Sequence, residues 1–191
     1  PFGHAGEDAL TEALASKGYP EFDHNDQTLR IVSQLEARYA DFDGLNLTWE
    51  TVEGIAKHNG PVFGELPETI QALDQQWDLD VTGYASGEAQ VAALADDIAY
   101  NCHDIDDGVR VGLLSFDDFT HLPLLGDIIR EVTGKYPNLD PSKLRHEVLR
   151  RLMDAMVSDV VATATARLRA LPEASCDAIR KADGPVVEFS L

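Results

Sequence analysis

Three polar side chains recur at four-residue spacing within the stretch EAQVAALADDIAYNCHDIDDG, residues 88–108. On a helix, which turns about 100° per residue, Asp96, Tyr100 and Asp104 share one face. With about 1.5 Å of rise per residue, the two carboxylates stand roughly 12 Å apart, which is about the reach of a nucleotide. The pattern predicts a ligand-binding face, with a solvated acidic face as the alternative. An apolar stripe is expected at Val91, Leu94, Ile98 and Ile105.

A second set of candidate residues lies near two predicted helix starts. His24 follows Asp23 in a first turn, where the helix dipole favours a neutral imidazole and a nearby carboxylate favours the imidazolium. If the first two helices form a hairpin, Glu7 is the candidate partner, and a Glu7–His24 pair could move a proton near neutral pH. The alternative is that His24 only occupies a helix end.

The His103–Asp104 pair suggests adjacent metal ligands, but on a helix the two side chains diverge by about 100°. Chelation of one ion by both is therefore disfavoured. The sequence contains no GxxxxGK[ST] loop, no GxGxxG after a strand and no GxSxG elbow. P-loop, Rossmann and serine-hydrolase chemistries consequently have no support.

The elements that must position these residues are predicted to be helices, because the apolar spacing is helical and no segment alternates cleanly. A capping pair is expected at Asp23 and Asp26, another at Ser115 and Asp118, and an Asp140–Pro141 start for the last long helix. Residues 61–87 are expected to form a long loop, and 186–189 the one candidate strand. Helices are expected over residues 6–16, 24–40, 48–60, 88–108, 122–133 and 141–171.

Composition limits the partners of this 191-residue chain. Fifteen Lys and Arg against 34 Asp and Glu give a formal charge of −19, which would repel a polyanion such as DNA. A small anionic ligand is compatible with that charge if a divalent cation inverts the local field. We therefore do not expect bulk nucleic acid as a partner, and we expect a metal ion to assist the binding of any anionic ligand.

Cys102 and Cys176 are isolated cysteines without CxxC spacing, so neither a zinc site nor a disulfide framework is predicted. No apolar run approaches the roughly 18 residues that a membrane span needs, and no signal peptide is visible. A cytoplasmic protein without a membrane partner is expected. The abrupt start at Pro-Phe-Gly-His and the end at Glu-Phe-Ser-Leu suggest a fragment.

Four motifs, PFGHAGED, FDHNDQTLRIV, FDGLNLTWETVEGIAKHNGP and EAQVAALADDIAYNCHDIDDGVR, occur in this order. From Pro1 to about Ser190 the chain resembles the dGTPase-like deoxynucleoside triphosphate triphosphohydrolases of the HD-domain superfamily. The resemblance implies an all-α, HD-type helical domain over residues 1–191. It also implies a homo-oligomer that hydrolyses dNTPs with a divalent metal ion such as Mg²⁺ or Mn²⁺, with further dNTP as a candidate activator.

The resemblance assigns Asp96 as the distant aspartate of the catalytic metal, whose other ligands are a histidine and an adjacent His-Asp pair. In the family those ligands lie just upstream of PFGH. We therefore expect this chain to lack both the upstream metal ligands and the C-terminal helices that follow VEFS in the family. In this form the chain is expected to be inactive.

The same resemblance assigns roles around the substrate. Tyr100 would lie against the deoxyribose and disfavour a 2′-hydroxyl, and Asp104 would accept from the 3′-hydroxyl. His4 would contact the phosphates, and Glu7 with His24 would form the catalytic pair. Two other hypotheses remain: a dNTP-binding regulatory protein without catalysis, and a helical interaction module.

Overall fold

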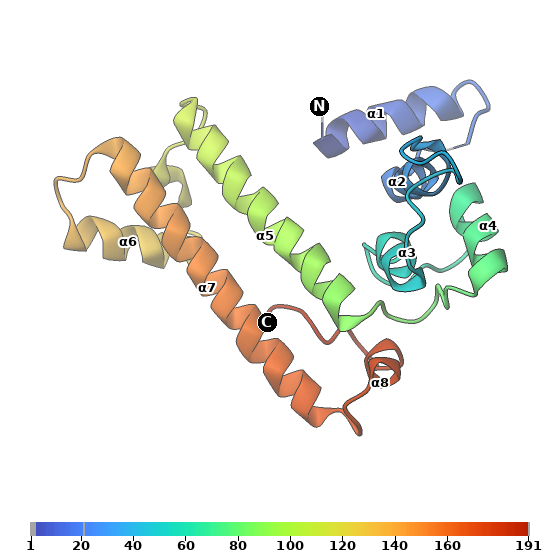
Figure 1. The fold of residues 1–191 in the computed structure, drawn as a ribbon. Helices are drawn as coiled ribbons and strands as arrows, with labels where there is room; N and C mark the ends of the chain where they lie inside the picture. The colour runs from blue at the N-terminus through green and yellow to red at the C-terminus, as the bar shows by residue number, and fades with distance from the viewer. Residues whose placement is uncertain (1–2, 21, 191) are drawn as a thin grey trace. The chain divides into compact units, whose positions relative to one another are not determined.

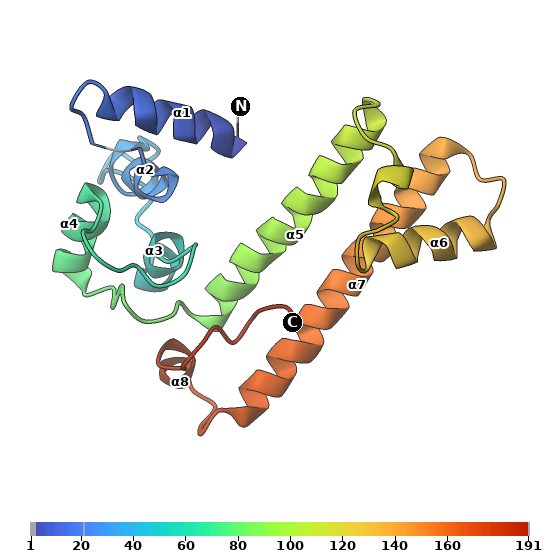
Figure 2. The ribbon, with the colours of Figure 1, turned by 180° about the vertical axis from the view of Figure 1, so that it is seen from behind.

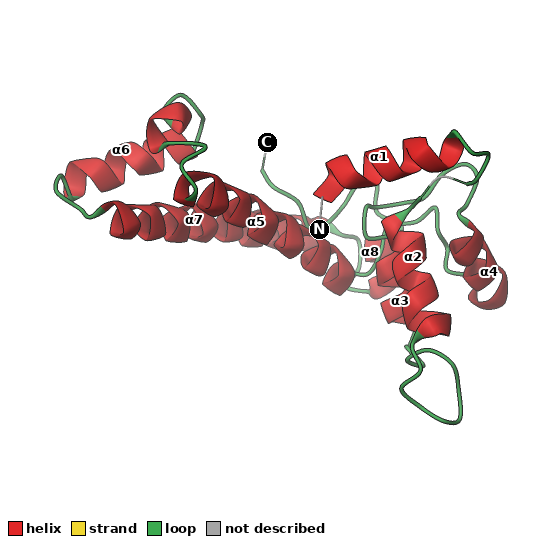
Figure 3. Cartoon of the chain, turned by 90° about the horizontal axis from the view of Figure 1, so that it is seen from above, coloured by secondary structure: helices red, strands yellow, loops and turns green. Residues whose placement is uncertain are grey.

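The computed structural model describes residues 3–20 and 22–190, and all of the regular secondary structure in these ranges is helical (Figures 1 and 3). The predicted all-α class is confirmed, whereas residues 186–189 form no strand. None of the helices in the described ranges is long and apolar enough to span a membrane. The helices are α1 (Gly3–Ala15), α2 (His24–Arg30), the π-helix η1 (Ile31–Leu35), α3 (Trp49–Ala56), α4 (Glu68–Trp77), α5 (Gly87–Arg110), the 3₁₀-helix η2 (Phe116–Phe119), α6 (Leu125–Lys135), α7 (Pro141–Ala170) and α8 (Cys176–Arg180).

The contacts divide the chain into two compact units. Unit 1 takes the described residues up to Gln90 and the later segment Ser175–Pro185, which contains α8. Unit 2 takes Val91–Ala174 and the described residues from Val186 onward. The chain therefore leaves unit 1 in the first turn of α5 and returns to it after α7. That the chain forms a single HD-type domain remains a prediction.

Unit 1 is organised around α2, which contacts both α3 and α4 (Figures 1 and 2). Leu29 of α2 is fully buried in a cluster with Val52 of α3 and with Ile70 and Leu73 of α4. The expectation of a long loop over residues 61–87 is wrong, because α4 lies within it. Its buried residues Thr69, Ile70 and Leu73 follow helical spacing, and that apolar face is held by the core.

The start of α4 is stabilised by a carboxylate from far upstream in the chain. Asp23 caps α2 as predicted, since its Oδ1 accepts from the backbone N–H of Asp26 at 2.7 Å. The Asp26 carboxylate does not return this bond; Oδ1 accepts from the backbone N–H groups of Thr69 at 2.8 Å and Ile70 at 3.1 Å. Asp26 thereby satisfies the unpaired donors of α4, a role that a proline N-cap cannot fill.

A π-helical turn ends the α2 segment earlier than the predicted helix over residues 24–40. The backbone N–H of Leu45 donates to the carbonyl of Val32 at 2.8 Å, and that of Gly44 donates to Glu36 at 2.9 Å. Gly44 adopts φ +70°, and a Cβ there would lie 2.4 Å from the Ser33 carbonyl oxygen. The loop over residues 36–48 is therefore folded tightly back onto η1, which only glycine permits at this position.

Unit 2 is built from α5, α6 and α7, with Cys102, Ile129, Val132 and Val148 in its buried cluster. The predicted stripe on α5 is partly wrong: Ile98 is buried, but Val91 is 52% exposed. Burial on α5 instead continues to Cys102, which packs with residues of α6 and α7, and to Gly108, which lies against the Leu114 side chain. Both cysteines are free thiols, which agrees with the absence of a predicted disulfide.

Local capping signals of unit 2 are confirmed. The Asp140 carboxylate accepts from the backbone N–H of Ser142 at 2.9 Å, with Pro141 in the first turn of α7. Ser115 and Asp118 form the predicted reciprocal capping box, here opening the short helix η2. α6 begins at Leu125 rather than at Leu122, because Leu122 lies in the turn before it, with its N–H bonded to Phe119.

Candidate functional site

Glu7 connects two histidines in unit 1. Its Oε1 lies 2.8 Å from Nδ1 of His24 and accepts from the backbone N–H of the same residue at 3.2 Å. Its Oε2 lies 3.4 Å from Nδ1 of His4, and the two imidazole rings meet edge to face with centroids 6.2 Å apart. When the Nδ1–H group of His24 donates a hydrogen bond to Glu7, the other ring nitrogen, Nε2, is left to exchange a proton with another molecule.

Polar contacts, rather than core packing, hold α1 at this place. His4 and Glu7 are three residues apart and so share a helix face, while His24 is the first residue of α2. Thr11 adds a hydrogen bond from its hydroxyl to the carbonyl of Phe22 at 3.2 Å. α1 has no buried residue, and its Leu10 is 43% exposed.

The electrostatics of this cluster favour an ionised Glu7. The hydrogen bond from His24 is the main cause that holds the pKa of Glu7 below its usual value of 4.5. The His24 side chain is 42% exposed and Glu7 is 22% exposed. A carboxylate that stays charged and an imidazole open to solvent together form a pair able to transfer protons.

The second predicted group lies on α5, in unit 2. Asp96, Tyr100 and Asp104 are all exposed and occupy successive turns of one continuous helix, so the predicted shared face exists. Ser86 caps this helix, because its Oγ accepts from the backbone N–H of Ala89 at 3.2 Å. The structure thus brings His4, Glu7 and His24 together in unit 1 and aligns the other three residues within unit 2.

Curated relatives match the chain over its whole length. The deoxyguanosinetriphosphate triphosphohydrolase-like proteins of Paracoccus denitrificans and of one strain of Cereibacter sphaeroides are each 53% identical to it over 190 residues. The chain is thus similar, over its whole length, to proteins named deoxyguanosinetriphosphate triphosphohydrolase-like. The protein of that name from Allorhizobium ampelinum is 52% identical over 198 residues. All three alignments take in 100% of this chain, which spans about half the length of the curated relatives it matches.

No family model matches the chain, so the HD-domain assignment remains a prediction. Within residues 3–20 and 22–190, no group of three or more His, Cys, Asp and Glu side chains is placed to hold a metal ion. Asp96 is a single carboxylate, and one carboxylate leaves most positions of a divalent ion unfilled. The described residues therefore do not by themselves fit a catalytic metal. His103 and Asp104 are both exposed on consecutive positions of α5, which agrees with treating them as separate groups.

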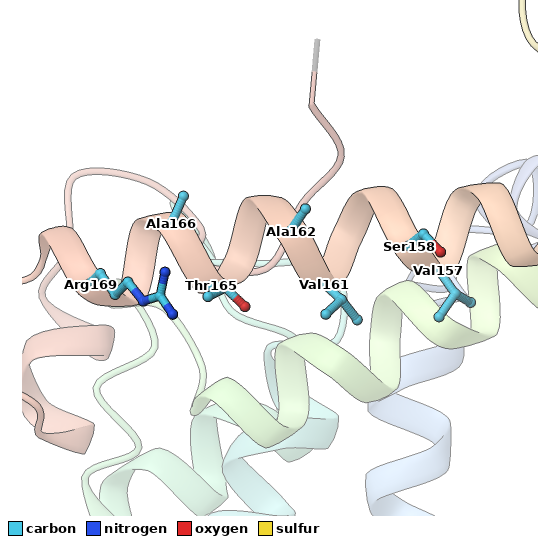
Figure 4. Close-up of a pocket in the computed structure, with 7 residues that line it drawn as sticks. All are labelled: Val157, Ser158, Val161, Ala162, Thr165, Ala166 and Arg169. Carbon is cyan, nitrogen blue, oxygen red and sulfur yellow. The ribbon is translucent and has the colours of Figure 1, made fainter.

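One cavity in each unit bears on the predicted site residues. One of about 250 Å³ lies in unit 1, where Asp23 and Asn25, the neighbours of His24, line it together with Asn59. The other, in unit 2, is an open hollow of about 490 Å³ along α7. Figure 4 shows Val157, Val161, Thr165 and Arg169 at successive turns beside it. The predicted site residues line neither cavity, but the first flanks the start of α2 that positions His24.

A buried charge cluster in unit 1 is absent from the sequence-based prediction. The Glu53 carboxylate accepts from Lys57 Nζ at 3.1 Å and from Arg180 Nε and Nη2 at 2.8 and 2.9 Å. Lys57 also donates to the carbonyl of Tyr84 at 3.4 Å, and the Arg180 guanidinium lies 4.9 Å from the centre of the Trp49 ring. The four-residue spacing of Glu53 and Lys57 in the sequence is compatible with an ion pair on one helix. Nothing in the sequence indicates Arg180, which lies 127 residues after Glu53.

Proposed function

We propose that the whole protein hydrolyses deoxynucleoside triphosphates to a deoxynucleoside and tripolyphosphate. The Glu7–His24 pair carries this proposal, because it provides a proton-transfer group in a chain whose relatives are named for dGTP triphosphohydrolysis. In this reaction a water oxygen bonds to the α-phosphorus, the bond from phosphorus to the 5′-oxygen breaks, and that oxygen takes a proton. His24 serves proton transfer at the leaving 5′-oxygen or at the attacking water, with Glu7 orienting its ring.

The remaining residues position the substrate in this proposal. His4 contacts the phosphates, Tyr100 lies against the deoxyribose, and Asp104 accepts from the 3′-hydroxyl. A divalent metal belongs to the proposal as the cofactor, with Asp96 as one of its ligands. The proposal further includes a cytoplasmic homo-oligomer, for which dNTPs are both substrates and candidate activators.

The test uses the full-length protein with dGTP and the other dNTPs in Mg²⁺ or Mn²⁺, with products separated by anion exchange. Replacing His24 by Ala is expected to lower kcat by about 10²–10⁴-fold with little change in KM. Adding Glu7→Gln to that variant should cost little more, because the two residues act as one unit. Glu12→Gln, an exposed carboxylate on the same helix, is the matched control.

Losses that multiply in the double variant would show that Glu7 and His24 act independently. If no dNTP is cleaved but dNTPs raise the melting temperature, the protein is a dNTP-binding regulator instead. If neither occurs, it is a helical interaction module.

The α5 residues are tested separately. Asp96→Ala is expected to abolish hydrolysis and lower the bound metal, whereas Asp97→Ala, on a position rotated by about 100°, should do neither. Tyr100→Ala should let ribonucleotides compete better with dNTPs. Full activity and metal content in Asp96→Ala, or unchanged sugar discrimination in Tyr100→Ala, would contradict the respective role.

A further inference from the structure

A cavity of about 220 Å³ lies in unit 1 among η1, the loop over residues 36–48, α3 and α4. Val52 and Leu73, both buried core residues, line its apolar side, and Trp77 also lines it. Its volume is below the usual 300–1,000 Å³ of sites for drug-sized ligands, so it suits one ring system. None of the residues assigned to dNTP hydrolysis lines it.

The rim of this cavity is polar. Gln34, Asp43, Asn46 and Gln76 line it, and all four are exposed. No hydrogen bond within the described ranges uses their side-chain groups, so three amides and one carboxylate are available to a ligand. An apolar floor with a few polar groups at the edge is the usual composition of a small-molecule site.

The backbone around the cavity is held in uncommon conformations. η1 is a π-helical turn, a feature frequent at functional sites, and it contributes Gln34. Asn46 adopts φ +51° without being glycine, next to the close approach of Gly44 to η1. Such conformations persist only where surrounding contacts enforce them, so the cavity rim is fixed before any ligand arrives.

Charge selects the class of ligand. Asp43 is the one charged side chain among the residues that line the cavity, and no Lys or Arg is among them. A carboxylate without a cation beside it disfavours a phosphate, and the formal charge of −19 adds to this. Amides and a carboxylate beside an aromatic side chain are the groups that read the hydrogen-bonding edge of a base.

We propose that this cavity binds the base of an uncharged nucleoside, preferring a purine whose edge offers two N–H donors to Asp43. Trp77 and the apolar floor provide the surface against which a ring packs, and the amides of Gln34, Asn46 and Gln76 complete the edge contacts. A deoxynucleoside is also the product of the proposed reaction, but binding here needs no turnover. The assignment therefore stands or falls apart from the proposed function.

The test measures binding of deoxyguanosine, thymidine and dGMP to the 191-residue chain by isothermal titration and by amide chemical shifts. Deoxyguanosine is expected to shift the amide resonances of Leu47 and Val52. We expect dGMP to bind about tenfold more weakly than deoxyguanosine, because Asp43 repels its phosphate. Asp43→Asn should weaken deoxyguanosine binding about tenfold and remove the preference over dGMP. Asp41→Asn, the same charge change in the same loop outside the cavity, should stay within about twofold of the parent.

A second pair of variants, on α4, keeps the test valid if Asp43→Asn misfolds the loop. Gln76→Ala should weaken binding about fivefold, whereas the neighbouring Gln75→Ala on α4 should not. The proposal is overturned by the absence of binding, by equal affinity for deoxyguanosine and dGMP, or by shifts confined to the His24 region. Because no outcome depends on hydrolysis, failure here is distinguishable from failure of the proposed function.

Discussion

Two glutamates of unit 1 each accept hydrogen bonds from two basic side chains, yet their surroundings differ. Glu53 is bonded by Lys57 and Arg180, and the Glu53 and Lys57 side chains are fully buried. Glu7 is bonded by His24 and approached by His4 at an open surface. The hydrogen bond to Glu53 raises the pKa of Arg180, which keeps that guanidinium charged.

The comparison shows that the basic partner and its exposure decide what a bridging carboxylate does. Arginine and lysine around a buried carboxylate fix the positions of α3, α8 and the Tyr84 segment. The histidines around the half-buried Glu7 carboxylate lie within reach of solvent, and imidazole is a side chain suited to exchanging a proton with another molecule. The Glu53 cluster is therefore structural, and the Glu7 cluster is the one suited to proton transfer.

The largest expected effect is that of Glu53→Ala on stability. Removing the carboxylate leaves the fully buried Lys57 ammonium without its ion-pair partner and removes both hydrogen bonds from Arg180, which keeps an ion pair with Asp177 at 3.9 Å. Breaking a buried ion pair by removing one partner typically costs about 3–5 kcal/mol of unfolding free energy. Urea unfolding followed by circular dichroism measures the loss. Glu50→Ala, on the exposed side of the same helix, is the control, and a similar loss in both variants would remove the distinction.

Lys57→Met sharpens the comparison, because the cluster has two cations for one carboxylate. The remaining Glu53–Arg180 pair is neutral and keeps both hydrogen bonds, so we expect a loss of at most about 1.5 kcal/mol. The same unfolding experiment applies, with the exposed Lys181→Met as control. A loss as large as that of Glu53→Ala would mean that all three charges act as one unit.

Glu7→Gln is expected to change the unfolding free energy by less than about 1 kcal/mol, since the pair is partly solvated. Its effect should appear instead in the kcat of the proposed dNTP hydrolysis by the full-length protein. Glu12→Gln again serves as the control. A stability loss approaching that of Glu53→Ala would assign Glu7 a structural role.

The smallest expected effect is the pH dependence of the Glu7 contribution. Because the folded-state pKa of Glu7 lies below 4.5, its contribution is fully present above pH 4.5 and is lost as the pH falls through the lowered value. The difference in unfolding free energy between the parent and Glu7→Gln should shrink over that acidic range. A difference that grows on acidification would contradict the bond to His24.

Features that depend on neighbouring residues could be predicted from the sequence. The caps at Ser86, Ser115 and Asp140 involve partners two or three residues away, and the shared face of Asp96, Tyr100 and Asp104 follows from helix geometry alone. The Glu7–His24 contact followed from treating the first two helices as a hairpin. These predictions needed no knowledge of distant packing.

Features that depend on distant partners were missed. α4 has few apolar residues, and its N-terminal cap comes from Asp26, 43 residues upstream of Thr69. The helix expected over residues 6–16 forms as part of α1, but none of the described residues of α1 is buried. Arg180 gave no local sign that it would join Glu53, so the cluster could be recognised only from the fold.

The return of the chain to unit 1 after α7 has a consequence for synthesis on the ribosome. Glu53 and Lys57 are translated more than 120 residues before Arg180, and at about 5–20 residues per second that interval lasts roughly 6–25 s. During this time Glu53 has Lys57 as a partner, but the two hydrogen bonds from Arg180 cannot form. Unit 1, which includes Ser175–Pro185, therefore reaches its full set of contacts only after α5, α6 and α7 have been translated.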